Sequence, residues 1–278
     1  MRRADGDKRR QSGLLVALGL LGLLAGQAAA ETVRDLYRGE TIVTGQDNLP
    51  ERERGFREAL KQVVVKVSGD ARLIEQERFE RMLEQAADYV ARFDYEDRKK
   101  GIQISDEQGT RDRSYHLRVD FVPERIDRAV AELGGKPWSA ERPKLLVLLG
   151  IRDTVSAYVL GMETVRGYGQ RETFLLLERR RGIPLVLPRM DAAESRSIGY
   201  DDVASAKDGS AFQDLKEKYG ADAVLLGTMD VTPAGYWDTR WTLLNAGQAA
   251  SWRSDGLTFD RAIADGLGRS ARLMAGSD

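Results

Sequence analysis

The sequence predicts a protein of mixed α+β and α/β class: a signal peptide followed by two small sheet-and-helix domains, the second with a partly parallel sheet. Three observations predict this division. Residues 1–30 differ in composition from the rest of the 278-residue chain. A stretch rich in Gly and Pro, at 133–144, interrupts the periodic segments. Beyond it, apolar runs alternate with helical patterns, which is typical of parallel strands. We therefore expect domains at 31–138 and 143–278.

Residues 1–30 have the layout of a secretory signal peptide. Five basic residues precede an apolar run from Leu14 to about Leu24, and the small residues QAAA close the segment. This order of charge, apolarity and small residues is typical of a cleaved leader. The apolar run is also shorter than the roughly 20 residues that a membrane-spanning helix needs. An uncleaved amino-terminal anchor is the alternative.

Composition limits the compartment and the classes of partner. The leader holds five of the 43 Lys and Arg and two of the 44 Asp and Glu, so the remainder has 38 basic and 42 acidic residues and a net charge of −4. This near-neutral balance gives no electrostatic footprint for nucleic acid. The chain has no cysteine and therefore no disulfide, which fits a bacterial envelope compartment better than a eukaryotic secretory route. We expect a periplasmic protein with no membrane span in its mature chain.

The segment ALKQVVVKVSGD, at 59–70, decides how the first domain is interpreted, because its valines suggest a strand. The apolar residues from Phe56 to Val67 nevertheless recur at spacings of 3, 1, 3, 1 and 3, which is one face of a helix. Burying that face contributes about 1.5–3 kcal/mol per large side chain, far more than the helix propensity lost at each valine. The turn at Ser68-Gly69-Asp70 is therefore expected to end a helix, with a phosphate cradle as the alternative.

The rest of the first domain is expected to place helices on one face of a small sheet. The expected elements are a strand at 33–43, a helix at 75–90, strands at 91–97 and 113–123 around a turn near 106–112, and a helix opened by Pro123. The strand at 113–123 alternates, with Leu117 and Val119 on its apolar face and His116 on its polar face.

The second domain reads as a sheet with several buried strands. The expected elements are a strand at 144–151, a helix at 170–181 stopped by Gly182, a short strand at 183–188, a helix capped by Ser210, a strand at 221–231, a hairpin and a terminal helix from Phe259 to Met274. The continuous apolar run at 144–151 is typical of a strand buried on both faces.

Several kinds of chemistry are excluded by residue type. His116 is the one histidine and there is no cysteine, so a zinc site of His and Cys ligands cannot be built in one chain. A Ser–His–Asp triad would need His116, which the strand pattern places on a solvent-facing side. Gly167-Tyr168-Gly169 lacks the third glycine of a dinucleotide-binding loop. We expect no metal site and no cofactor.

Carboxylates cluster after the strand expected at 183–188: Asp191, Glu194, Asp201 and Asp202. Ligands often bind beyond the carboxyl ends of sheet strands, so this acidic loop is a candidate site for a two-carboxylate hydrolase or for loosely held calcium. A solvated loop with no ligand is the alternative.

Aromatic residues gather in the expected hairpin at 235–256: Tyr236, Trp237, Trp241 and Trp252. A two-residue turn at 246–247 would place Trp241 opposite Trp252, where an aromatic pair stabilises the sheet. These residues either seal the sheet against the terminal helix or form an exposed patch for a protein or glycan partner, as tryptophans at binding hot spots do.

Four motifs resemble, in the same order, those of the bacterial domain-of-unknown-function family 2066: EALKQVVVKVSGD, RGIPLVLPRMD, KYGADAVLLGTMD, and RWTLL with its downstream tryptophan. The resemblance implies an exported bacterial protein whose activity is unassigned, and it assigns no catalytic residues. We therefore expect a soluble periplasmic accessory protein whose partners are other envelope proteins. The alternative is a carboxylate-dependent hydrolase acting on cell-wall or glycan material.

Overall fold

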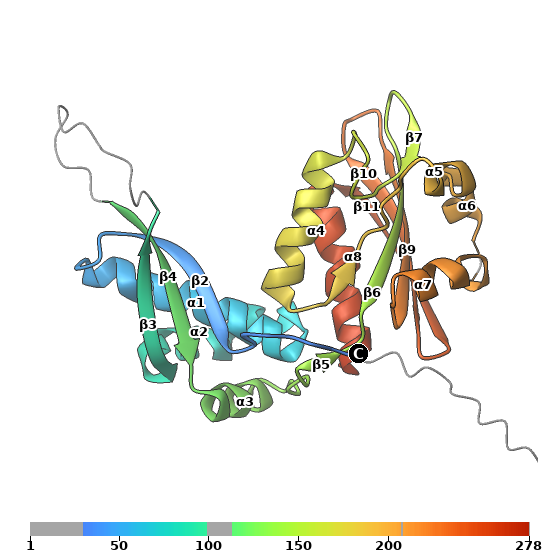
Figure 1. The fold of residues 1–278 in the computed structure, drawn as a ribbon. Coiled ribbons are helices and arrows are strands. Elements are labelled where there is room, and N and C mark those ends of the chain that lie inside the picture. Colours follow the sequence, from blue (N-terminus) through green and yellow to red (C-terminus); the bar gives the residue numbers. More distant parts are fainter. Residues whose placement is uncertain (1–29, 99–112, 207, 278) are drawn as a thin grey trace, which may run out of the picture.

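The computed structural model describes residues 30–98, 113–206 and 208–277, and it shows an α+β protein with two main sheets, each packed against helices (Figure 1). The predicted signal peptide (all but Ala30) and the turn predicted at 106–112 lie outside these residues. The predicted fold class is confirmed, whereas the signal peptide stays a prediction.

The first half of the chain forms a three-stranded antiparallel sheet with helices on one face. Its elements are β2 (Arg38–Thr44), α1 (Leu49–Ser68), α2 (Glu77–Glu84), β3 (Val90–Asp97), β4 (Ser114–Phe121) and α3 (Pro123–Glu132). The strand order is β2-β4-β3. One hydrophobic core fills the space between this sheet and the helices, with members between residues 36 and 133.

The valine-rich segment at 59–70 is helical, as predicted. It forms the second half of α1, where Val63, Val64 and Val67 are fully buried. Gly69 has a φ of +72°, and its N–H donates to the carbonyl of Val65. Gly69 is therefore a left-handed carboxyl cap, and its amide is not available to a ligand.

Two predicted elements of the first half are shorter than expected. The strand expected at 33–43 begins only at Arg38, because Asp35 has a φ of +53° and turns the chain. The helix expected at 75–90 is α2 alone, flanked by 3₁₀ turns at Ala71–Glu75 and Ala86–Tyr89. Val90 already belongs to β3. The apolar residues keep a helical spacing across α2 and both 3₁₀ turns. Such spacing does not distinguish an α-helix from a short 3₁₀ turn.

The second half forms a six-stranded mixed sheet between two layers of helices. Its strands are β6 (Leu145–Arg152), β7 (Ala157–Val159), β8 (Leu185–Val186), β9 (Ala223–Val231), β10 (Trp237–Asn245) and β11 (Gln248–Leu257). Its helices are α4 (Tyr168–Arg181), α5 (Glu194–Ser197), α6 (Tyr200–Ser205), α7 (Gln213–Lys218) and α8 (Phe259–Ala275).

The strand order is β11-β10-β9-β6-β7, with β8 also pairing with β6. β6 runs parallel to β9 and β8, and the other pairs are antiparallel, so the predicted partly parallel sheet is confirmed. Helices α4 and α8 cover one face, and α5, α6 and α7 cover the other (Figure 1). As expected for a strand buried on both sides, Leu145 to Ile151 of β6 are inaccessible to solvent.

The second half also departs from the predictions in detail. The strand expected at 183–188 pairs only at Leu185–Val186. Ser210 opens a 3₁₀ turn, Ser210–Phe212, and α7 follows it. Helices α5 and α6 were not predicted, because elements of four and six residues are too short for a helical period to show in the sequence.

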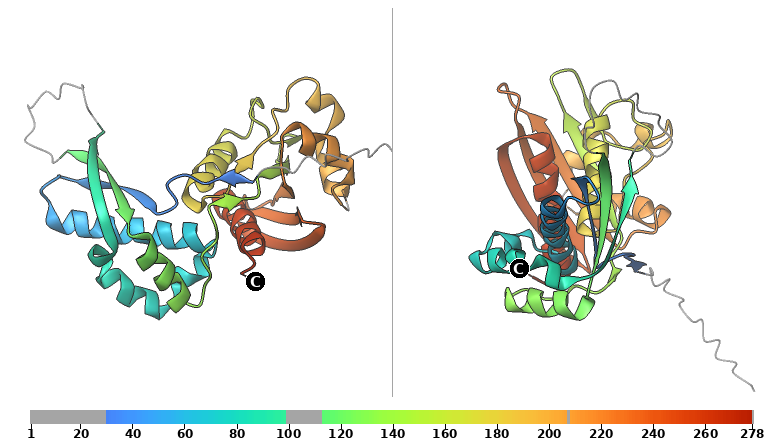
Figure 2. Two further views of the ribbon diagram at one scale, coloured as in Figure 1. Left: turned by 60° about the horizontal axis from the view of Figure 1, so that its bottom comes forward. Right: turned by 90° about the vertical axis from the view of Figure 1, so that its left-hand side faces the viewer.

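The two halves meet at a junction built around Arg142. A short pair of strands, β1 (Glu31–Thr32) and β5 (Glu141–Arg142), runs between them (Figure 2). The Arg142 side chain is fully buried and donates to five carbonyl oxygens, those of Lys66, Trp138, Ser139, Arg181 and Gly182. Its guanidinium also lies 4.0 Å from the centre of the Trp138 ring.

These acceptors explain how a buried cation is tolerated with no carboxylate bonded to it. Lys66 lies in the last turn of α1, and Arg181 and Gly182 end α4, so the guanidinium sits at the carboxyl ends of two helices. Helix carboxyl ends carry partial negative charge and unsatisfied carbonyls. Burial lowers the pKa of Arg142 to about 10, which leaves it charged at neutral pH. One side chain therefore joins α1, α4 and the linker.

Candidate functional site

The carboxylates of the predicted acidic loop do not form a common site. Asp191 accepts from the backbone N–H groups of Ala193 and Glu194, and Asp202 accepts from the N–H of Gly199. Both are therefore used locally, as caps of turns. The side chain of Asp201 is 94% exposed and pairs with Arg152 over 3.3 Å.

Glu194 is the buried member of this loop. It is 6% exposed, and its carboxylate accepts from the N–H of Met190, the hydroxyl of Tyr219 and the ammonium of Lys218. Burial acts to raise its pKa, but these hydrogen bonds outweigh burial and hold the pKa below its usual value. Both carboxylate oxygens thus accept from groups of the protein itself. Within the described ranges, no three His, Cys, Asp or Glu side chains are grouped so as to hold a metal ion.

The aromatic residues of the hairpin divide between core and surface. Ala246 and Gly247 form the predicted two-residue turn, with φ values of +49° and +78°, and Trp241 lies opposite Trp252 as predicted. Trp241 is 1% exposed and Trp252 is 8% exposed, so both belong to the core against α8. Trp237 is partly buried, and only Tyr236 is well exposed. The four side chains therefore offer no shared exposed patch.

His116 lies on the polar face of β4, between Ile42 of β2 and Glu96 of β3. Its neighbour Arg118 pairs with Glu40, Asp94 and Glu96 across the same face. The placement on a half-exposed, charged sheet face agrees with the alternation read from the sequence.

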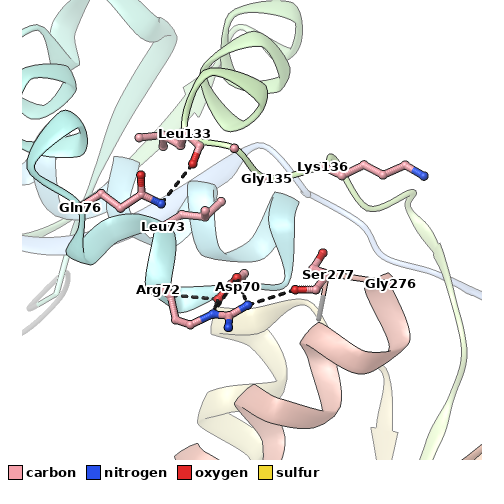
Figure 3. Close-up of a pocket in the computed structure, with 10 residues that line it drawn as sticks. Asp70, Arg72, Leu73, Gln76, Leu133, Gly135, Lys136, Gly276 and Ser277 are labelled. Carbon is pink, nitrogen blue, oxygen red and sulfur yellow. Dashed lines mark hydrogen bonds and ion pairs between the residues drawn. The ribbon is translucent and has the colours of Figure 1, made fainter.

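One hollow of about 430 Å³ lies where α1, the end of α3 and the end of α8 meet (Figure 3). Asp70 and Arg72 occupy its floor, joined by hydrogen bonds of 2.8–3.1 Å, and Arg72 also donates to the carbonyl of Ser277. Lys136 extends away from this pair in Figure 3. Arg72 already joins Asp70 to the carbonyl of Ser277 across the junction. The hollow is therefore interpreted as part of the seam between the halves.

A larger groove, of about 1490 Å³, runs between the two halves. One wall comes from α1 and the edge strand β2, and the other comes from the second half of α4 (Leu176–Arg181). The segment from Glu31 to Asp35 also lines it. We call this the α1–α4 groove, and it is the candidate functional site.

The backbone of β2 along this groove is closed by side chains of α1. The side-chain amide of Gln62 accepts from the N–H of Glu40 and donates to its carbonyl, over 3.2 and 2.7 Å. Further along, Arg54 donates to the carbonyl of Ile42 and Lys66 donates to that of Arg38. These groups take the positions that a neighbouring strand would fill, which protects an edge strand from further pairing. A partner in the groove must therefore bind through side chains.

The groove is richer in positive charge than the protein as a whole. Seven Lys and Arg line it against five Asp and Glu, whereas the full chain has a net charge of −1. Arg179 and Arg180 are exposed in the last turn of α4, and Arg34 is exposed near β1. None of the three makes an ion pair within 4.0 Å in the part of the chain that the structure describes.

Burial alters three ionisable groups of the groove. It lowers the pKa of Lys66, whose ammonium donates to carbonyls. It also lowers the pKa of Arg181, and the nearby charge of Arg272 adds to this effect. Burial raises the pKa of Glu178, and Glu31 raises it further, against opposing contributions from the N–H of Leu185 and from nearby cations.

Among the residues that line this groove, the sequence drew attention to His116 as the one histidine, but not to the arginines of α4. The run Arg179-Arg180-Arg181 before Gly182 is a charge cluster in the sequence, but basic residues are also common in the last turn of any helix. Arg142 gave no signal, because one arginine between two loops resembles any solvated side chain. The packing of α1 near α4 is a tertiary contact, which the spacing of residues within each helix does not reveal.

Comparison with known proteins adds one similarity. The family model described as "Domain of unknown function (DUF8605)" matches residues 30–139, which span the first sheet and its helices. This is not family 2066, and the match neither supports nor contradicts that resemblance. No curated protein and no solved structure matches the chain significantly. None of the helices in residues 30–98, 113–206 and 208–277 has the length and apolarity needed to cross a membrane.

Proposed function

We propose that the protein is an exported, non-enzymatic accessory protein of the cell envelope that binds another envelope component in the α1–α4 groove. The observation that carries this proposal is the size and setting of the groove. Its volume of about 1490 Å³ exceeds the roughly 300–1,000 Å³ of pockets for small molecules, which favours a segment of a macromolecule. The Arg142 junction fixes the two walls, and a preformed surface loses less entropy on binding.

Export is tested by fractionating the host and sequencing the amino terminus of the recovered protein. The expected product lies in the periplasmic fraction and begins at Glu31, the residue after the predicted leader. Recovery of the chain from the cytosol with Met1 still attached contradicts this part of the proposal.

Binding in the groove is tested by placing a photo-crosslinking amino acid at Leu176 and irradiating intact cells. Leu176 lies on the α4 wall and is 38% exposed. The matched control places the same amino acid at Val155, which is 76% exposed in the loop between β6 and β7. We expect a defined crosslinked product at position 176 and none of the same size at position 155. No product at 176, or the same product at both positions, contradicts the proposal.

One observation favours a second function, the carboxylate-dependent hydrolase. Glu178 has a raised pKa in the groove, next to the charge of Glu31, and a general acid needs such a pKa. This function predicts that the protein releases soluble fragments from purified cell-wall sacculi and that Glu178→Gln abolishes the release. If the Glu178→Gln variant and the unchanged protein give the same background release, this function is wrong.

A further inference from the structure

The α4 wall of the groove offers cations that the protein does not use. Arg179 and Arg180 are exposed, and neither has a carboxylate partner within 4.0 Å among the described residues. By contrast, Lys61 on the α1 wall pairs with Glu58 over 3.0 Å, and Arg38 of β2 pairs with Asp120 over 2.7 Å. The unneutralised positive charge of the groove therefore lies mainly on α4.

The end of a helix usually repels anions, because its last carbonyls carry partial negative charge. At the end of α4 two of the terminal carbonyls are occupied: Arg142 donates to those of Arg181 and the cap residue Gly182, over 3.2 and 2.6 Å. The buried guanidinium offsets the negative end of the helix dipole. The arginine side chains consequently determine the field that an incoming group meets there.

Apolar side chains lie in the groove beside these cations. Leu176 on α4 is 38% exposed and Ile42 on β2 is 43% exposed, and Val65 and Ile74 also line the groove. Contact with both kinds of side chain requires an occupant that carries acidic and apolar groups together. A polyphosphate or an acidic polysaccharide has the charge without the apolar groups.

We propose that the occupant of the α1–α4 groove is an acidic amphipathic helix of a partner protein, with its apolar stripe on Leu176 and Ile42 and its carboxylates on Arg179 and Arg180. A helix suits this groove because the edge of β2 is closed by Gln62 and Arg54, so an added strand finds no backbone partner there. Docking of a helix by anchors at i, i+3, i+4 and i+7 is a common mode of recognition. This inference rests on the proposed function and adds the chemistry of the partner.

The test uses the purified protein and two fluorescein-labelled synthetic peptides of about 18 residues, long enough to form an amphipathic helix. Both carry the same leucine stripe, and their other positions hold Glu in one peptide and Lys in the other. Fluorescence anisotropy measures Kd at low and at moderate salt. The protein variant is Arg179→Glu with Arg180→Glu. Its control is Arg128→Glu with Arg196→Glu, which makes the same charge change at two exposed positions that do not line the groove.

The unchanged protein should bind the Glu peptide at least about tenfold more tightly than the Lys peptide, and added salt should weaken this preference. The Arg179/Arg180 variant should lose the preference, and the Arg128/Arg196 control should keep it. Equal binding of both peptides, or a preference that survives in the Arg179/Arg180 variant, overturns the inference. Displacement of the Glu peptide by polyphosphate at equal charge concentration also overturns it, because the apolar contacts would then contribute nothing.

The two proposals fail in different ways. If Leu176 captures a partner in cells while the peptides show no charge preference, the groove binds something, but not an acidic helix. If Leu176 captures nothing and neither peptide binds, the proposed function fails together with the inference.

Discussion

The Nη1 atom of Arg142 lies 2.6 Å from the carbonyl oxygen of Gly182, and this bond ties the linker between the two sheets to the end of α4. Substitution Arg142→Met keeps much of the side-chain volume but removes every donor. Each buried carbonyl left without a donor costs about 1–3 kcal/mol. We therefore expect the free energy of unfolding, measured in urea, to fall by at least about 3 kcal/mol. Arg128→Met, exposed on α3, should change it by less than about 0.5 kcal/mol; equal effects of the two substitutions contradict this account.

Trp241 fills the space above Gly266 of α8, where an added Cβ would lie 2.6 Å from Cε2 of the indole ring. Gly266→Ala should therefore destabilise the protein by about 1–3 kcal/mol through overpacking. Gly169 in α4 has room for a Cβ, with its nearest neighbour at 3.5 Å, so Gly169→Ala should be neutral or stabilising. Thermal melts of the two variants test this difference in sign. Trp241→Phe should recover part of the loss in the Gly266→Ala protein.

Within the acidic loop, the carboxylate of Glu194 is buried and bonded to the protein, whereas that of Asp201 is exposed to solvent. Glu194→Ala leaves the N–H of Met190 and the hydroxyl of Tyr219 without their acceptor, and we expect a loss of about 2–4 kcal/mol in urea unfolding. Asp201→Ala removes one exposed ion pair and should cost less than about 1 kcal/mol. If the Asp201→Ala protein loses binding of a ligand while its stability is unchanged, the acidic loop is a functional site.

Asp70 holds the side chain of Arg72, which donates to Ser277 across the seam, so the ionisation of Asp70 affects stability. Burial acts to raise its pKa, but hydrogen bonds from the side chain and N–H of Arg72 outweigh burial and keep the pKa below its usual value. A carboxyl whose pKa is depressed in the folded state stabilises the protein above its unfolded pKa of about 3.9, and this contribution is lost as the pH falls through the folded value. The Tm difference between the unchanged protein and Asp70→Asn should be constant from neutral pH to about pH 5 and shrink below pH 4. A difference that does not vary with pH would contradict the role of ionisation.

Gln62 closes the edge of β2, so its loss should expose that edge. Gln62→Met leaves the N–H and the carbonyl of Glu40 without partners, and exposed strand edges pair with other chains. We expect the sedimentation coefficient of this variant to rise with concentration more steeply than that of the unchanged protein. Lys61→Met, on the same helix but with no bond to β2, is the control. The idea is wrong if both variants sediment as the unchanged protein does.

Sequence patterns predicted the elements in which many residues follow one spacing, but they did not predict the contacts between elements. The helix at 59–70 and the buried strand at 144–151 were identified because many apolar positions agreed on one spacing. The turn at Ala246-Gly247 and the pairing of Trp241 with Trp252 followed from hairpin geometry. Helices α5 and α6 were not predicted, because four to six residues are too few to show a helical spacing of apolar side chains. The α1–α4 groove could not be predicted, since it depends on how Arg142 arranges the carboxyl ends of two helices that lie far apart in the sequence.

The bonds of Arg142 have a consequence for how the molecule responds to acid. Its acceptors are amide carbonyls, which stay unprotonated at any pH that a cell meets, whereas the neighbouring Asp70–Arg72 link depends on a carboxylate. Acidification below about pH 4 would therefore release Arg72 from Asp70 and weaken its contact with Ser277 of the second half, while the bonds of Arg142 stay in place. The tie that Arg142 makes between α1, α4 and the linker would thus outlast the tie at Arg72 as the pH falls.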